Sequence, residues 1–241
     1  MAIYTSKTRI DLEDVGYSNK ITNKAILKIL ENAGARQSET IHFGLNDMEN
    51  VGFSWILLGW KVKILKRPIY NEELTINTWG RESNRIFTYR DYEIYDESGE
   101  LCTIATSKWA IVDINTGKLR ELTPEIIEKY QCETKKVFEE DYTLKLKEPV
   151  TIIRKQEYKA QRRDIDINKH IHNLYYLDYA YEVLPEEVYE APECNNIEIM
   201  YKKQIRLNDE FKCLYTKEEN QNIVTMKSED ENTLHAIIKL Y

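Results

Sequence analysis

Apolar residues recur at helical spacing in two segments of the chain, one in each half. In the first half the apolar positions are Ala25, Ile26, Ile29, Leu30 and Ala33. In the second half they are Leu174, Leu177, Tyr181 and Leu184, and the pattern ends near Pro185. The sequence therefore predicts a long helix in each half.

Runs typical of β-strands follow both predicted helices. In the first half they cover residues 55–65, 73–82, 86–95 and 101–114. In the second half they cover residues 197–207, 210–216, 222–227 and 234–241. Turn residues such as Asp-Glu-Ser-Gly separate the runs. Each half therefore predicts a strand, a helix and then an antiparallel meander.

Residues 14–23 (DVGYSNKITN) and 164–173 (DIDINKHIHN) align without gaps, which indicates an internal duplication. The aligned pairs are Asp14 with Asp164, Val15 with Ile165, Ile21 with Ile171 and Asn23 with Asn173. A helix wrapped by a curved antiparallel sheet is the hotdog architecture, so two tandem copies predict a double hotdog of the α+β class. An unrelated α+β protein is the alternative, and the repeated order disfavours it. We expect an N-terminal hotdog at residues 1–130, a linker at 131–148 and a C-terminal hotdog at 149–241.

Composition and charge exclude several classes of protein. The 241 residues carry a formal net charge of −7, whereas nucleic-acid binders usually present a basic surface. The four cysteines show no CxxC spacing, so neither a zinc site nor a disulfide framework is expected. The first residues lack the apolar stretch of a secretory signal, and no run is long enough for a membrane-spanning helix. We therefore expect a cytoplasmic protein with no metal and no membrane span.

The second copy of the repeat carries a cluster of polar side chains. Polar residues and isoleucines alternate between residues 164 and 171. This alternation predicts an extended strand or turn with Asp166, Asn168 and His170 on one side and the isoleucines in the core. We also expect Asn168 or Asn173 to cap the helix that follows.

A carboxylate, an amide and an imidazole are groups that thioester hydrolysis can use. A carboxylate can attack the carbonyl carbon or deprotonate water, and a histidine can transfer the proton. An asparagine can orient the water or donate to the oxyanion. The alternative is that these residues only cap a helix or form a solvated loop. The first copy holds Gly16, Ser18 and Lys20 at the aligned positions, so the architecture does not require the cluster.

The segment RRDIDINKHIHNLYYLDYA resembles the signature R-x-D-x-D-x-N-x-H-x-N-N-x-x-Y of acyl-acyl-carrier-protein thioesterases. Two other stretches are similar to that family, namely residues 55–65 with Arg67-Pro68, and residues 105–109 leading to Arg120. The resemblance covers nearly the whole chain and implies hydrolysis of fatty acyl-carrier protein to free fatty acid and carrier protein, without a cofactor. It also implies that Asp166, Asn168 and His170 are catalytic.

The chain departs from the family after the second helix. The family often has Y-R-R-E-C there, whereas this chain reads Tyr201-Lys202-Lys203-Gln204-Ile205. Isoleucine cannot act as a nucleophile, and glutamine cannot act as a general base, although Gln204 can position water by hydrogen bonding. Asp166 is therefore the better candidate for base or nucleophile, and Gln204 is kept as a further site residue.

Basic residues are concentrated beside the candidate site. Arg162, Arg163, Lys202 and Lys203 are expected to dock an acidic acyl carrier protein, with an ordinary solvated surface as the alternative. The acyl chain is expected to lie in the first copy. The residues expected to line it, each of which could equally be an ordinary core residue, are Ile26, Leu30, Phe53, Trp55 and Leu57.

The sequence leaves other functions open. They are hydrolysis of acyl-coenzyme A, binding of acyl chains without turnover, and a hotdog dehydratase, which fits the motif less well. The oligomeric state is open as well, because the two copies can pair within one chain or two chains can form a homodimer.

Overall fold

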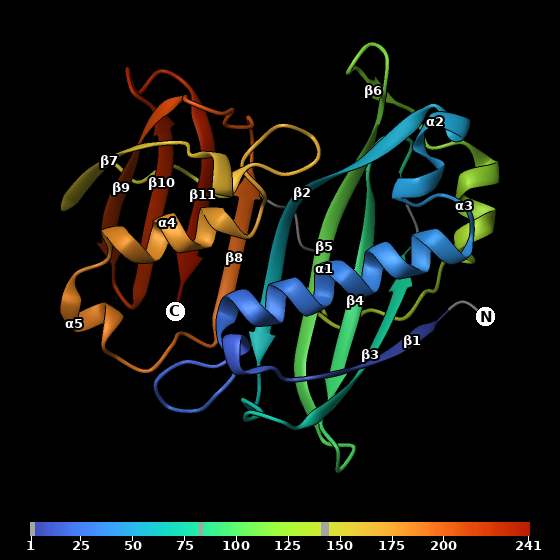
Figure 1. The fold of residues 1–241 in the computed structure, drawn as a ribbon, viewed down its shortest axis with the longest axis horizontal. Helices are drawn as coiled ribbons and strands as arrows, with labels where there is room; N and C mark the ends of the chain where they lie inside the picture. Colours follow the sequence, from blue (N-terminus) through green and yellow to red (C-terminus); the bar gives the residue numbers. More distant parts are fainter. Residues whose placement is uncertain (1–2, 82–83, 141–144) are drawn as a thin grey trace. The chain divides into compact units, whose positions relative to one another are not determined.

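The computed structural model of the protein describes residues 3–81, 84–140 and 145–241. The chain divides into two units, Met1–Thr143 and Leu144–Tyr241. Each unit contains a helix packed against an antiparallel sheet (Figure 1). Residues 82 and 141–144, from one predicted strand and from the predicted linker, lie outside the described residues. The α+β class and the repeated order of strand, helix and meander are confirmed.

The sheet of the first unit follows the order β1-β3-β4-β5-β2, and the short strand β6 pairs with β5. All of these neighbours are antiparallel. The strands are β1 (Tyr4–Arg9), β2 (Phe53–Ile64), β3 (Glu73–Gly80), β4 (Thr88–Tyr95), β5 (Leu101–Asp113) and β6 (Leu119–Arg120). The hydrogen bonds between these strands lie in the plane of the sheet. The apolar face of the sheet is therefore buried by packing against a helix.

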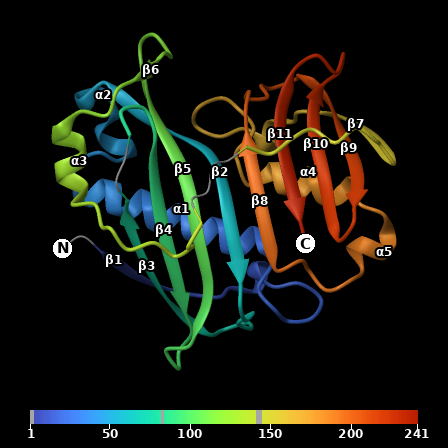
Figure 2. The same ribbon diagram turned by 180° about the vertical axis from the view of Figure 1, so that it is seen from behind.

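Helix α1 (Asn23–Thr40) crosses that face of the sheet (Figure 2). It begins at Thr22, whose side-chain oxygen accepts a hydrogen bond from the Ala25 amide at 3.2 Å, as expected for an N-cap. Ile26, Leu27 and Leu30 are almost fully buried. Burial of this apolar face, rather than helix propensity alone, therefore holds α1 on the sheet.

Shorter elements complete the first unit, namely the 3-10 turns η1 (Leu12–Asp14) and η2 (Leu45–Asp47) and the helices α2 (Met48–Val51) and α3 (Pro124–Tyr130). The sequence analysis did not predict α3, although its start is marked by the capping residue Thr123 and by proline at the first helical position. Ile126 and Tyr130 of α3 pack against Phe43 and Phe53 in one apolar cluster.

The sheet of the second unit follows the order β8-β11-β10-β9-β7, again antiparallel. Its strands are β7 (Arg154–Lys159), β8 (Asn196–Tyr201), β9 (Glu210–Glu218), β10 (Gln221–Ser228) and β11 (Leu234–Leu240). The 3-10 turn η3 (Arg162–Asp164) precedes helix α4 (Tyr175–Val183), and α5 (Glu186–Tyr189) follows it. Helix α4 buries Tyr176, Leu177, Ala180 and Val183.

The prediction of one strand over residues 197–207 is wrong at its C-terminal end. Strand β8 ends at Tyr201, and residues 202–204 are exposed. The chain leaves the sheet there because the next residues pair elsewhere. The Ile205 carbonyl accepts a hydrogen bond from the Ile171 amide at 2.8 Å, and Arg206 forms a bridge with His170.

Among the described residues, no helix is both long enough and apolar enough to cross a membrane.

Candidate active site

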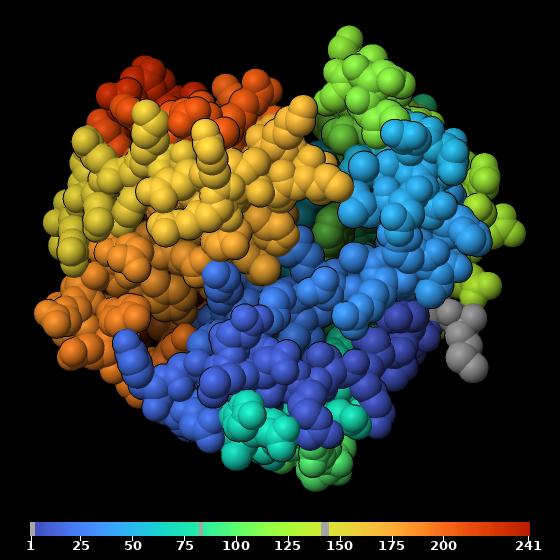
Figure 3. Space-filling view, viewed as in Figure 1, coloured from blue at the N-terminus to red at the C-terminus, as the bar shows by residue number. Residues whose placement is uncertain are grey.

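The predicted cluster lies on a tight turn between η3 and α4. The Asp166 amide donates to the His170 carbonyl at 2.9 Å, and the Lys169 amide donates to the Asp166 carbonyl at 3.0 Å. Ile165 and Ile171 close the turn through an antiparallel bridge. In the space-filling view, the yellow-to-gold segment that carries η3 and this turn lies at the surface (Figure 3).

Of the two alternatives, an extended strand or a turn, the structure has the turn: a 3-10 turn ends at Asp164 and a reversing turn follows it. Lys169 has a left-handed backbone with φ of 63°. Ile171 is buried as predicted, but Ile165 is only half-buried and the side chain of Ile167 is 68% exposed. The alternating pattern therefore predicted burial correctly for Ile171 but not for Ile167.

The prediction that an asparagine caps the second helix is also wrong. Leu174 is the N-cap of α4, and it has a helical backbone and no capping side chain. The ring nitrogen Nδ1 of His172 accepts the Leu174 amide hydrogen bond at 3.3 Å instead. His172 therefore has a local structural role, and Asn168 is free of the capping role.

The Asp166 carboxylate faces back toward its own turn. Its Oδ1 atom accepts the Asn168 amide at 2.8 Å and the His170 amide at 3.4 Å. Asp166 and His170 are half-buried, whereas Asn168 is exposed. Among the described residues, no hydrogen bond joins the side chains of Asp166, Asn168 and His170, although the Asp166 carboxylate acts electrostatically on the His170 imidazole.

The first copy forms the same turn without these side chains. There the Gly16 amide donates to the Lys20 carbonyl, and the Asn19 amide donates to the Gly16 carbonyl, each at 3.0 Å. Asn19 has φ of 59°, in the same left-handed region as Lys169. Since a glycine suffices for this turn, the carboxylate of Asp166 is not needed to form it.

The neighbouring Asp164 has a different role. Its side chain is almost completely buried, and Oδ2 accepts the Gln161 amide at 2.8 Å and the Tyr179 hydroxyl at 2.6 Å. In the first copy Asp14 is equally buried, accepts the Asp11 amide at 3.1 Å and pairs with the ammonium group of Lys28. The aspartate at this position therefore holds the turn in both copies.

The surroundings of His170 favour its neutral form. Burial lowers its pKa below the ordinary value of 6.5, since burial disfavours the charged imidazolium. The Asp166 carboxylate opposes this shift, whereas the guanidinium of Arg206 adds to it. A neutral imidazole can accept a proton, so this shift is compatible with a proton-transfer role for His170.

Gln204 lies on the segment that pairs with the turn, and its side chain is exposed. Among the described residues that side chain makes no hydrogen bond to the predicted cluster. Its counterpart in the first copy is Arg67, because the following carbonyls, of Pro68 and Ile205, accept equivalent amides from Ile21 and Ile171. Arg67 donates to the Ile21 carbonyl at 2.9 Å, so a long side chain at this position reaches the turn.

Exposed cations lie on the turn, just before it, and on the segment that pairs with it. Besides the predicted Arg162, Lys202 and Lys203, they include Lys169 and Arg206, and within the described part of the chain none of the five forms an ion pair. Arg163, also predicted, lies 3.7 Å from an oxygen of Asp164. The sequence analysis missed Lys169, although it stands between Asn168 and His170.

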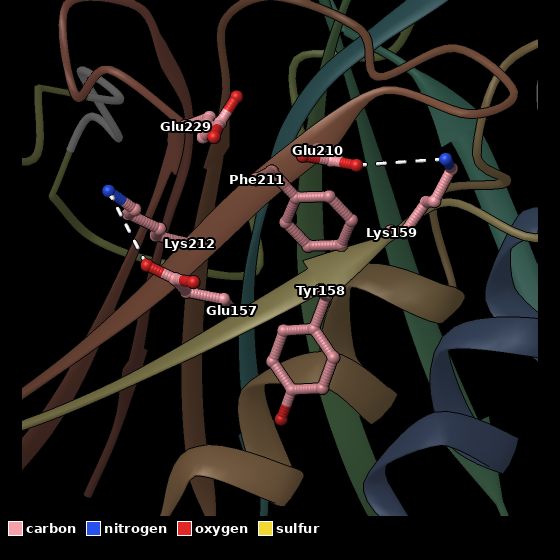
Figure 4. A pocket seen from close by; sticks show the side chains of 7 residues that line it. All are labelled: Glu157, Tyr158, Lys159, Glu210, Phe211, Lys212 and Glu229. Atoms are coloured by element: carbon pink, nitrogen blue, oxygen red, sulfur yellow. Dashed lines mark ion pairs between the residues drawn. The ribbon is translucent and has the colours of Figure 1, made fainter.

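A shallow depression of about 250 Å³ lies on strands β7 and β9 (Figure 4). Its charged side chains pair with one another across the strands, Glu157 with Lys212 and Lys159 with Glu210, each pair at 3.6 Å. None of the predicted catalytic residues lines it, so it is not a candidate active site. Within the described residues, no group of three or more His, Cys, Asp or Glu side chains is arranged to hold a metal ion.

Two family models match the sequence. The acyl-ACP thioesterase N-terminal domain matches residues 1–130, and the acyl-ACP thioesterase C-terminal domain matches residues 147–239. Similar curated proteins include oleoyl-acyl carrier protein thioesterase 2 of Arabidopsis thaliana, 25% identical over 92% of this chain and 65% of that protein. The corresponding enzyme of Coriandrum sativum is 25% identical over 93% of this chain and 65% of that protein. The chain thus spans just under two thirds of the length of these plant relatives.

Solved structures share the fold over the whole chain. An acyl-ACP thioesterase from Bacteroides thetaiotaomicron has a TM-score of 0.86 at 23% identity, covering 99% of this chain and 97% of that one. A 12:0-ACP thioesterase from Umbellularia californica has a TM-score of 0.84 at 17% identity, covering 100% of this chain and 96% of that one. The predicted double hotdog of the α+β class is confirmed.

Proposed function

The chain belongs to the acyl-ACP thioesterase family, and we propose that it hydrolyses fatty acyl-acyl carrier protein to a free fatty acid and the carrier protein. The observation that carries this proposal is the pair of equivalent turns. The second turn holds Asp166, Asn168 and His170, whereas the first has the same backbone without them. Polar side chains that the fold does not need are available for chemistry.

The proposed reaction replaces the carbon–sulfur bond of the thioester with a carbon–oxygen bond. Asp166 takes a proton from water as the oxygen attacks the carbonyl carbon, or its carboxylate attacks directly and water then cleaves the resulting anhydride. Asn168 orients the water or donates to the oxyanion of the tetrahedral intermediate. His170 starts neutral, accepts the proton that the consumed water releases, and passes this proton to the departing thiolate. Gln204 contributes a hydrogen bond to the attacking water.

The exposed cations support a carrier protein as the partner. In a chain with net charge −7, the unpaired cations beside the turn provide a local positive surface. We propose that Arg162, Arg163, Lys202 and Lys203 dock the acidic carrier protein by electrostatic steering. In this proposal the first copy, residues 1–130, holds the acyl chain, residues 131–148 link the copies, and residues 149–241 supply the chemistry. A cytoplasmic location and a homodimer stay predictions from the sequence.

The test is release of free thiol from acyl-carrier protein and from acyl-coenzyme A, measured in parallel. Asp166→Asn keeps a side-chain oxygen for the two turn amides but removes the base, so we expect thiol release to fall by about 10²-fold or more. Asp230→Asn is the matched control, because Asp230 also accepts a nearby amide, that of Asn232 at 3.1 Å, in a turn of the same unit. This control is expected to keep full activity.

Each other result has a defined meaning. Equal activities of the Asp166→Asn variant and the native chain would remove Asp166 from the mechanism. Faster release from coenzyme A than from the carrier protein would identify coenzyme A as the substrate handle. Acyl-chain binding with no thiol release from either substrate would identify a binding protein instead of an enzyme.

A further inference from the structure

Two side chains of the second unit hold the segment that carries Gln204. The Nδ1 atom of His235, on β11, lies 2.8 Å from the Lys203 carbonyl oxygen. The Ile205 amide donates to the hydroxyl of Tyr176, on α4, at 3.2 Å. His235 and Tyr176 are both buried, whereas the side chain of Gln204 is exposed. The backbone is therefore fixed on both sides of Gln204, while its side chain stays accessible.

The contact with Lys203 defines which ring nitrogen of His235 carries a proton. A carbonyl oxygen only accepts hydrogen bonds, so Nδ1 is protonated and donates to it. The main-chain carbonyl of His235 also accepts the Lys202 amide at 2.8 Å. His235 thus holds the segment twice, once through its backbone and once through its ring.

The first copy has the backbone contact without the ring. There the Leu65 amide donates to the Cys102 carbonyl at 2.7 Å, as the Lys202 amide does to the His235 carbonyl. Cys102 therefore occupies the position of His235 and is buried like it. Its thiol contacts the Glu100 carbonyl at 3.4 Å and makes no bond to the segment. A cysteine suffices for the backbone contact, so folding alone does not explain the imidazole.

The hydrogen bond to Tyr176 is also confined to the second copy. Pro68 occupies the position of Ile205, because their carbonyls accept equivalent amides, and proline has no N–H to donate. Continuing the aligned repeat into the helices places Ile26 at the position of Tyr176. Ile26 is buried in the same way but has no hydroxyl group. Both partners of this hydrogen bond therefore differ between the copies.

The first copy anchors its segment through Arg67, at the position of Gln204. The guanidinium group of Arg67 donates to the Ile21 carbonyl at 2.9 Å and to the side-chain oxygen of Asn23 at 2.7 Å. Within the described part of the chain, the Gln204 side chain makes no such bond to the second turn. The second copy therefore anchors the segment through other residues and leaves this side chain available to a water molecule.

We propose that His235 and Tyr176 are positioning residues that fix Gln204 beside the turn that carries His170. The proposal rests on the proposed function, in which Gln204 donates to the attacking water. Arg206, on the same segment, forms a bridge with His170, so an anchored segment defines where Gln204 lies relative to the turn. Without the two anchors, Gln204 would sample more orientations and would align the water less often.

The first test replaces His235 with three residues. His235→Cys installs the residue of the first copy and removes the ring donor, so we expect kcat to fall about tenfold. His235→Asn places an amide N–H near the position of Nδ1 and should recover most of this loss, whereas His235→Gln places it near Nε2 and should not. The losses should be equal for acyl-carrier protein and for a short neutral thioester, because positioning affects the chemical step. A native kcat in His235→Cys would overturn the proposal.

The second test removes the hydroxyl group of Tyr176. Tyr176→Phe leaves the Ile205 amide without its acceptor, and we expect kcat to fall about fivefold. Tyr215→Phe is the matched control, because Tyr215 is buried in the same unit and its hydroxyl lies 3.0 Å from the side-chain oxygen of Asn222. The control is expected to keep the native kcat. Equal losses in both variants would show a general effect of packing and would overturn the positioning role.

A double-mutant cycle tests whether His235 acts through Gln204. Gln204→Ala alone is expected to lower kcat about tenfold. If His235 acts by placing Gln204, adding His235→Cys to this variant should lower kcat by less than about twofold more. A double variant whose loss equals the product of the two single losses would overturn the proposal.

Amide hydrogen exchange separates this inference from the proposed function, because it requires no turnover. The Ile205 amide is expected to exchange about tenfold faster in His235→Cys than in the native chain, and His235→Asn should restore the slow exchange. Faster exchange in a chain that releases no thiol would support the anchoring contact and overturn the hydrolase. Thiol release with unchanged exchange and unchanged kcat in His235→Cys would overturn the positioning role alone.

Discussion

Replacing Asp166 with glycine should separate catalysis from folding. The substitution gives the second turn the residue that the first turn already has in Gly16, and that turn forms with the same backbone hydrogen bonds. The native fold should therefore persist. In the proposed mechanism, however, the base or nucleophile is gone.

The structure bounds both effects. The variant loses two hydrogen bonds from backbone amides, at 2.8 and 3.4 Å, to a half-buried carboxylate, and it gains the backbone freedom of glycine. Together these effects cost about 2 kcal/mol, which lowers the melting temperature of a chain of this size by about 4–8 °C. Native proteins have about 5–15 kcal/mol of stability, so the variant stays folded. Thiol release should nevertheless fall by about 10²-fold or more.

The assay is thiol release together with thermal unfolding followed by circular dichroism. Asp164→Ala is the contrasting variant, because it leaves the Gln161 amide and the Tyr179 hydroxyl without a buried acceptor. We expect it to lose about 3 kcal/mol or more. If Asp166→Gly instead unfolds and loses activity in proportion to its unfolded fraction, the carboxylate is structural and the reasoning is refuted.

Three further predictions concern charge, pH and packing. Raising the salt concentration should slow turnover of acyl-carrier protein more than that of a short neutral thioester, and exchanging Lys202 and Lys203 for glutamine should reduce this difference. An equal response of both substrates to salt would argue against electrostatic docking. Because burial lowers the pKa of His170, its neutral form persists at lower pH, and the acidic limb of the kcat/KM profile should lie below pH 6.5. An acidic limb above pH 6.5 would contradict the role of His170 in proton transfer. The Gly34→Ala variant should lose about 1–3 kcal/mol of unfolding free energy, measured in urea, because the new Cβ would lie 2.9 Å from the Tyr92 hydroxyl, although alanine has the better helix propensity. A stabilised variant would show that this contact relaxes.

The duplication could be predicted from sequence because the residues that close each turn repeat. Val15 and Ile21 form an antiparallel bridge, as do Ile165 and Ile171, and both pairs were aligned in the sequence analysis. The order of helix and strands was predicted for the same reason, since apolar periodicity reports which face is buried. The position of the candidate residues on one turn follows from this alignment.

The conformation within the turn could not be predicted. A left-handed backbone is expected at asparagine, as at Asn19, but a lysine such as Lys169 gives no such signal. Without that reversal, the alternating isoleucines indicate a strand, and Ile167 is wrongly assigned to the core. The burial of Arg90 on β4 was equally hidden, because its hydrogen-bond partner Gln37 lies on α1, 53 residues away in the sequence.

The presence of both copies on a single polypeptide has a consequence for how they can diverge. In an assembly of two identical chains, any amino-acid change alters both subunits, so a residue needed in one must be tolerated in the other. Here Arg67 occupies one copy at the position that Gln204 occupies in the other. A single gene can thus keep a cation where it holds the first turn and omit it beside the second turn, which carries the candidate residues, an asymmetry that a symmetric dimer cannot reach.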